Sequence, residues 1–221
     1  MGYKKEITKK LNSMAGRYSG YEIFCDWITT MAISISNSSD VLHGPVWQQR
    51  ERTYMDIVHK HGEAITEFAD LTGMLVMTIE EELSDTLGEI YMEAGMGSSA
   101  AGQFFTPFHV SEVCARLDLA EVIKNYDGRK IQLYEPTCGG GGMIIAAAKV
   151  LRENGINYQK CLEVIGQDLD YKGVYMTYVM CSFMGIKATI VQGNTLTEPY
   201  PLAKIPPGRI WKTPAKKGML L

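Results

Sequence analysis

The sequence lacks any segment typical of a membrane or a secreted protein. It has no run of about 18 apolar residues and no apolar signal core at its N-terminus. Apolar residues make up 46% of the chain and charged residues 21%, which is ordinary for a globular protein and argues against disorder. We therefore expect a folded protein with no membrane segment.

The sequence contains few cysteines, and their spacing does not indicate pairs. The five cysteines are widely spaced and contain no Cys-X-X-Cys pair. This favours buried thiols in a reducing, cytoplasmic compartment over disulfides or a zinc site. His59 and His61 are two residues apart, so on a helix they point in different directions, and no acidic ligand pattern accompanies them. We expect no metal.

Neither sign of charge dominates, since the formal net charge is -3. The overall charge therefore does not indicate binding to nucleic acid. The two ends are nevertheless basic. Residues 1–20 contain Glu6 as their only acid, and residues 201–221 contain none. Basic ends can contact phosphates or can simply be solvated, and both interpretations stay open.

Residues 5–95 are predicted to be helical. Apolar spacing favours a helix over 21–35 and a second over 48–72. A further apolar stripe repeats every three or four residues, and the acids Glu80, Glu81, Glu82 and Asp85 lie off it. The stripe consists of Leu71, Leu75, Ile79, Leu83, Leu87 and Ile90. This predicts a packed helix with a solvated acidic face, followed by a flexible connection over 95–102.

The second half of the chain alternates strand and helix patterns. Thr106 and Pro107 suit the start of a helix that continues to about residue 120. After it come predicted strands at 130–135, 162–166 and 186–192, separated by helices that end near residues 154 and 184. Strands separated by helices predict a parallel α/β sheet.

The turn after the first predicted strand is rich in glycine. Gly139 to Gly142 connect that strand directly to a helix. Glycines allow close backbone approach, and the amides of a helix N-terminus favour an anion such as a carboxylate or phosphate. No Gly-Lys-Ser/Thr follows, and Ile144 occupies the third position of a Gly-X-Gly-X-X-Gly pattern, so two phosphate-binding motifs are absent. A turn that serves only packing is the alternative.

Two polar residues follow the next two strands. Asp168 stands at the carboxyl edge of the sheet, where open α/β sheets bind ligands, and could accept hydrogen bonds from a ribose. Its alternative is a helix N-cap, a role that Asp170 fits better. Asn194 could pair with an adenine edge or be an ordinary turn residue.

These segments together resemble adenine-specific DNA methyltransferases, in particular the modification subunit of type I restriction-modification systems. Residues 102–107 (GQFFTP) look like a segment of that family's S-adenosylmethionine pocket, and residues 135–142 (EPTCGGGG) are similar to its DPACGSGG loop. Residues 166–168 (GQD) and 193–196 (GNTL) match the next two family segments in order and spacing. Four ordered matches are more specific than any single one.

The resemblance implies S-adenosylmethionine as the cofactor. Phe104, Thr106 and Pro107 would line it, the glycine loop would hold its methionine moiety, Asp168 its ribose and Asn194 its adenine. The complete expected cofactor site is Gln103, Phe104, Phe105, Thr106, Pro107, Glu135, Pro136, Thr137, Cys138, Gly139, Gly141, Met143, Asp168, Asn194 and Thr195.

The catalytic segment of that family is not found. It reads Asn/Asp-Pro-Pro-aromatic, because an oxygen acceptor and a proline carbonyl localise the lone pair of the adenine amine while the ring stacks on the flipped base. The only Pro-Pro here is Pro206-Pro207, with Ile205 in place of the acceptor and Gly208 in place of the ring. The family's sheet also has more strands than can be read before Leu196.

The predicted fold is therefore a partial Rossmann-like methyltransferase sheet preceded by a helical region. We expect a helical N-terminal region at 1–101, a partial methyltransferase domain at 102–196 and a basic, proline-containing tail at 197–221. Three functions stay open: a cofactor-binding relative that cannot methylate DNA alone, an active methyltransferase completed by a partner or a longer chain, and a non-catalytic interaction module. DNA, a specificity or catalytic subunit, and a second copy of the chain are the expected partners.

Overall fold

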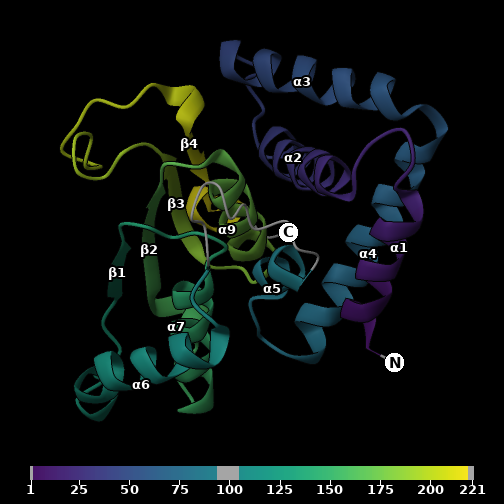
Figure 1. Ribbon diagram of the computed structural model, residues 1–221. Coiled ribbons are helices and arrows are strands. Elements are labelled where there is room, and N and C mark those ends of the chain that lie inside the picture. Colours follow the sequence, from purple (N-terminus) through teal and green to yellow (C-terminus); the bar gives the residue numbers. More distant parts are fainter. Residues whose placement is uncertain (1, 94–104, 219–221) are drawn as a thin grey trace.

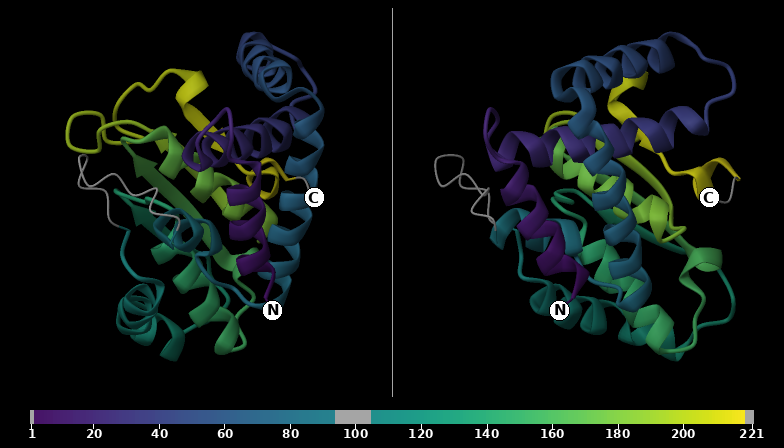
Figure 2. Two further views of the ribbon diagram at one scale, coloured as in Figure 1. Left: turned by 45° about the vertical axis from the view of Figure 1, so that its right-hand side comes forward. Right: turned by 90° about the vertical axis from the view of Figure 1, so that its right-hand side faces the viewer.

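The computed structural model describes residues 2–93 and 105–218. It has a small mixed sheet on one side and a group of helices on the other, as Figures 1 and 2 show. The helical group is α1 (Tyr3–Met14), α2 (Gly20–Ser38), α3 (Pro45–His61), α4 (Thr66–Glu81) and α5 (Thr86–Glu93). The predicted fold class, an α/β sheet preceded by a helical region, is confirmed.

The sheet contains β1 (Ile131–Glu135), β2 (Leu162–Asp168), β3 (Lys187–Gln192) and β4 (Ile210–Lys212), in that spatial order. The three predicted strands pair in parallel, whereas β4 is antiparallel to β3. The segment expected to be a basic tail thus contributes a strand. Three residues are too few to give a periodic signal, which is why the sequence did not reveal it.

Helices α7 (Gly142–Glu153) and α9 (Tyr171–Phe183) connect the parallel strands and pack on the sheet. The short helix α8 (Tyr158–Cys161) leads into β2, and α6 (Phe108–Lys124) packs on α7. On its far side α9 contacts α2, so it lies between the sheet and the helical group (Figure 1). The core is continuous across this junction, since α2, α7 and α9 all contribute fully buried side chains.

The C-terminal segment is fixed to the helical group by Arg50 of α3. Its guanidinium carbon lies 3.5 Å from the ring centroid of Trp211 in β4, and Arg50 also donates to the Ile210 carbonyl at 3.1 Å. Short 3₁₀ turns flank β4 at Pro207–Arg209 and Pro214–Lys217. This contact holds the last strand against a helix far away in sequence.

The prediction of one continuous helix over 48–72 is wrong, because this segment is divided between two helices. Helix α3 ends at His61, a 3₁₀ turn covers Gly62–Ile65, and α4 begins at Thr66. Gly62 has φ of 56°, a conformation that glycine adopts without steric cost and that ends an α-helix.

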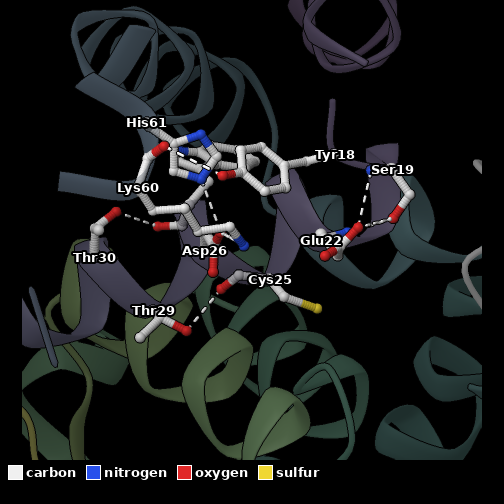
Figure 3. A network of polar contacts seen from close by, with 10 residues as sticks. Tyr18, Ser19, Glu22, Cys25, Asp26, Thr29, Thr30, Lys60 and His61 are labelled. Atoms are coloured by element: carbon white, nitrogen blue, oxygen red, sulfur yellow. Dashed lines mark hydrogen bonds and ion pairs between the residues drawn. The ribbon is translucent and has the colours of Figure 1, made fainter. Parts of the chain in front are cut away.

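A network of polar contacts fixes α3 to α2 at this break (Figure 3). The Asp26 carboxylate accepts from Lys60 Nζ at 2.7 Å and contacts His61 Nε2 at 2.8 Å. The Tyr18 ring covers both partners, with its centroid 5.3 Å from that of His61 and 4.4 Å from Lys60 Nζ. His59, in contrast, is exposed.

The apolar stripe from Leu71 to Ile90 is buried as predicted, but it does not belong to one helix. The chain leaves α4 at Glu82 and begins α5 at Thr86. The prediction of a solvated acidic face is correct for Glu80, Glu81 and Glu82. It is wrong for Asp85, which is only 3% exposed because it lies in the break and turns inward.

All five cysteines are free, and four of them are buried. Within residues 2–93 and 105–218, no helix is both long enough and apolar enough to cross a membrane.

Candidate cofactor site

A cavity of about 290 Å³ opens at the carboxyl ends of β1 and β2. The glycine loop, the N-terminus of α7 and the loop after β2 form its walls. Of the residues predicted to bind cofactor, those that line it are Phe105, Thr106, Thr137, Cys138, Gly139, Met143 and Asp168. The structure therefore brings these predicted residues together at one cavity.

Glycine is required at two positions of the loop. Gly139 has φ of 48° and Gly141 has φ of 97°, both in the left-handed region. A Cβ at Gly139 would lie 3.0 Å from the Phe105 ring, and one at Gly141 would lie 3.2 Å from Thr177 Oγ1. The loop thus packs against neighbouring side chains while its backbone faces the cavity.

Asp168 connects the end of β2 to this loop. Its Oδ2 accepts from the Gly139 amide at 2.8 Å, and its Oδ1 accepts from the Asp170 amide at 2.9 Å. Each carboxylate oxygen can accept a further hydrogen bond. Asp168 therefore fixes the loop and can still bind a ligand hydroxyl in the cavity.

The N-terminus of α7 faces the same space through Gly142 and Met143. The first amides of a helix have no acceptor within the helix, and the N-cap residue Gly141 supplies no side-chain cap. An α7 of 12 residues also carries a positive partial charge at this end. These features suit an anionic ligand group, as expected from the sequence.

The sequence did not indicate Asp85, Ser111, Asp170 or Gly173 as ligand contacts, although they line the cavity, whereas Gly140 and Gly142 belong to the predicted glycine loop. Burial raises the pKa of the Asp85 carboxyl to about 6, which the hydrogen bond from the Gly88 amide only partly offsets. Ser111 is fully buried, and its Oγ has no hydrogen-bond partner among the described residues. Asp85 precedes α5 and Ser111 belongs to α6, so only tertiary packing brings them to the glycine loop.

Asp170 is the N-cap of α9, as the sequence favoured. Its side chain accepts from the Lys172 amide at 3.1 Å and pairs with Lys172 Nζ at 3.1 Å. Asp170 also lines the cavity, which gives that space a third carboxylate beside Asp85 and Asp168.

The other predicted site residues that the structure describes do not line the cavity. Glu135 accepts from the Thr137 amide at 3.2 Å, and the Asn194 side chain accepts from the Leu196 amide at 3.0 Å, a turn contact. Thr195 donates to the Pro136 carbonyl, which joins the loops after β3 and β1. Pro107 is the N-cap residue of α6 and Gly141 that of α7, and Gln103 and Phe104 lie outside the described residues.

The Pro-Pro segment does not reach the cavity. Ile205 is buried, Pro206 and Gly208 are exposed, and Pro207 begins the 3₁₀ turn before β4. The Gly208 carbonyl accepts from Arg50. In the described part of the chain, no group of three or more His, Cys, Asp or Glu side chains could hold a metal ion.

Comparison with known proteins gives two findings. Residues 82–206 match the family model described as N-6 DNA Methylase. A crystal structure of the type I restriction-modification system methyltransferase subunit from Streptococcus thermophilus aligns with a TM-score of 0.46 and 16% sequence identity. That alignment covers 91% of this chain and 41% of the other, so the chain spans less than half of that subunit's length.

Proposed function

Because the chain belongs to the N-6 DNA methylase family, we propose that it binds S-adenosylmethionine in the cavity beside the glycine loop. The observation that carries this proposal is the combination of an uncapped α7 N-terminus with three carboxylates in one hollow. A ligand that carries a carboxylate, an ammonium, a sulfonium and a ribose matches both kinds of group. When bound, this cofactor supplies an electrophilic methyl group on its sulfonium.

The residues present fit such a ligand. The α7 amides suit its carboxylate, and Asp168 suits its ribose hydroxyls. Phe105 and Thr106 also line the cavity, and we propose that they flank the ligand. Asn194 is proposed to approach the adenine edge. Gln103, Phe104, Pro107, Glu135, Pro136 and Thr195 complete the proposed site by resemblance.

We propose further that this chain binds cofactor but does not methylate DNA alone. Ile205 offers no side-chain acceptor for an adenine amine, Gly208 offers no stacking ring, and neither lines the cavity. The alternative is an adenine-specific methyltransferase of a restriction-modification system, completed by a partner subunit, a second copy or further polypeptide. A non-catalytic interaction module is the third option. A cytoplasmic location, expected from the free cysteines, belongs to the same proposal.

Two measurements separate these functions. Calorimetric titration with S-adenosylmethionine tests binding, and transfer of a tritiated methyl group to unmethylated DNA tests catalysis. Binding without transfer supports the proposal, and transfer supports the active enzyme. The absence of any binding heat or thermal shift leaves only the interaction module.

Asp168→Ala tests the ribose assignment. We expect it to weaken S-adenosylmethionine binding by about 1.5–3 kcal/mol, the usual contribution of hydrogen bonds to a charged group. Asp56→Ala is the matched control, because Asp56 is an exposed carboxylate on α3 outside the cavity. Equal affinities for the two variants would contradict the role of Asp168.

DNA binding is proposed through the basic C-terminal segment. Lys216 already pairs with Glu163 and Lys217 donates to Ser39, so Lys212 and Lys204 are the more informative positions. If they contact phosphates, replacing both with Ala flattens the salt dependence of DNA binding. An unchanged slope would remove this contact from the proposal.

A further inference from the structure

We propose that Asp85 and Ser111 form a binding subsite for the α-ammonium group of the cofactor's amino-acid moiety. The subsite lies beside the α7 N-terminus, which suits the α-carboxylate of the same moiety. The inference rests on the proposed function, since it concerns the same cavity. It assigns a ligand group to two residues that lie outside both the glycine loop and the ends of the strands.

Asp85 presents a buried carboxylate with spare capacity. Its Oδ1 accepts from the Gly88 amide at 3.0 Å, whereas its Oδ2 accepts no hydrogen bond from the described residues. No salt bridge joins it to a described cation: the nearby Lys4 pairs instead with Glu89 and Glu93. A buried carboxylate without a cationic partner is energetically costly, so a cation from outside the fold is the natural partner.

Ser111 supplies an independent indication at the same place. Its side chain is fully buried, and its Oγ has no partner among the described residues. Buried hydroxyls nearly always find one. A hydroxyl oxygen can accept from an ammonium while the carboxylate beside it carries the charge.

The two side chains approach one point next to the loop. A Cβ built on Gly142 would lie 3.2 Å from Asp85 Oδ2 and 3.4 Å from Ser111 Oγ. Gly142 is also the first residue of α7, whose amides are free to bind an anion. Acceptors for an ammonium group and donors for a carboxylate therefore meet at Gly142. This arrangement matches the zwitterion of an α-amino acid.

Asp85 also caps α5, and a purely structural cap is the competing explanation. Substitution by Asn separates the two roles, because Asn caps a helix about as well as Asp but carries no charge. The probes are S-adenosylhomocysteine, which carries the zwitterion without the sulfonium charge, and 5′-methylthioadenosine, which lacks the amino-acid moiety. Their affinities are measured by displacement of tritiated S-adenosylmethionine at pH 7.5.

We expect Asp85→Asn to weaken S-adenosylhomocysteine about 10- to 100-fold, the range that a charged hydrogen bond gives. The affinity for 5′-methylthioadenosine should stay within about twofold, since neither role of Asp85 contacts the nucleoside. Ser111→Ala should show the same selectivity with a smaller loss. Unchanged S-adenosylhomocysteine affinity, or an equal loss for both probes, would overturn the inference.

Gly142→Ala provides a variant that leaves Asp85 and Ser111 intact. The added methyl group fills the point between them, so we expect the selective loss of S-adenosylhomocysteine to recur. Gly73→Ala in α4 is its control, because a Cβ there meets no atom within 4 Å. Failure of the wild-type protein to bind either probe would refute the proposed function itself, whereas wild-type binding with unselective variants would refute only this subsite.

Discussion

Two carboxylates that face the interior, those of Asp26 and Asp85, have contrasting surroundings. Asp26, in the helical group, lies within 2.8 Å of both Lys60 Nζ and His61 Nε2 (Figure 3). Asp85, at the cavity, accepts one backbone hydrogen bond and forms no ion pair with a described residue. Asp26 is the more exposed of the two, with 17% of its side chain accessible, yet it has the more complete set of partners.

This difference separates a carboxylate that serves the fold from one that is available to a ligand. A paired acid contributes to folding, and removal of one partner leaves a buried polar group unsatisfied. An unpaired buried acid destabilises the folded protein until a cation arrives. The two sites should therefore respond to mutation with opposite signs.

The largest effect is expected at Asp26. Asp26→Ala removes the acceptor shared by Lys60 and His61, and the His61 side chain is only 4% exposed. We expect the free energy of unfolding to fall by about 2–4 kcal/mol, measured by urea denaturation. Cofactor affinity should not change, because the network lies outside the cavity. A loss below about 0.5 kcal/mol would mean that this pairing is incidental.

Asp85→Asn should shift stability in the opposite direction. Burial raises the pKa of the Asp85 carboxyl from 3.8 to about 6. At pH 7 the folded state therefore holds a charge that burial disfavours, and removing that charge should raise the free energy of unfolding by about 1–3 kcal/mol. Urea denaturation of the ligand-free protein measures this. Destabilisation by this variant would indicate that the charge itself supports the fold.

The sequence predicted those features that short segments determine. The three parallel strands have apolar, β-prone runs of their own, and the glycine loop follows directly from its residues. The N-cap role of Asp170 could likewise be read from its place just before the helix. Each of these depends on contacts between residues that are close in the chain.

Asp85 and Ser111 were missed because their burial depends on distant elements. The repeat of Leu83, Leu87 and Ile90 continues the spacing of α4, so the break at Glu82 leaves no trace in apolar periodicity. A weak signal did exist: Asp is a favoured N-cap, and Asp85 directly precedes the helix that begins at Thr86. The inward turn of that cap requires the packing of α5 against the glycine loop, which no local pattern reports.

The pH dependence of stability sharpens the same comparison. The pKa of Asp85 is higher in the folded than in the unfolded state, so the protonated carboxyl group favours folding. This contribution to the free energy of unfolding is fully present below about pH 4 and is lost as the pH rises to about 6. The slope in this window should reach about 1 kcal/mol per pH unit. The difference between wild type and Asp85→Asn isolates it, since the other carboxylates titrate in both proteins. Parallel pH profiles would show that Asp85 does not titrate in this window.

The smallest effect is expected at Lys4, the cation that acts on Asp85 from a distance. Lys4 Nζ lies 2.7 Å from Glu89 and 2.9 Å from Glu93, and 28% of its side chain is exposed. Loss of such partly exposed pairs in Lys4→Met should lower the free energy of unfolding by about 0.5 kcal/mol. It should leave cofactor affinity unchanged, because Lys4 does not contact the carboxylate. If Lys4→Met instead destabilised the protein as strongly as Asp26→Ala is expected to, Lys4 would be an internal counterion of Asp85, and Asp85 would belong with Asp26 among the acids that serve the fold.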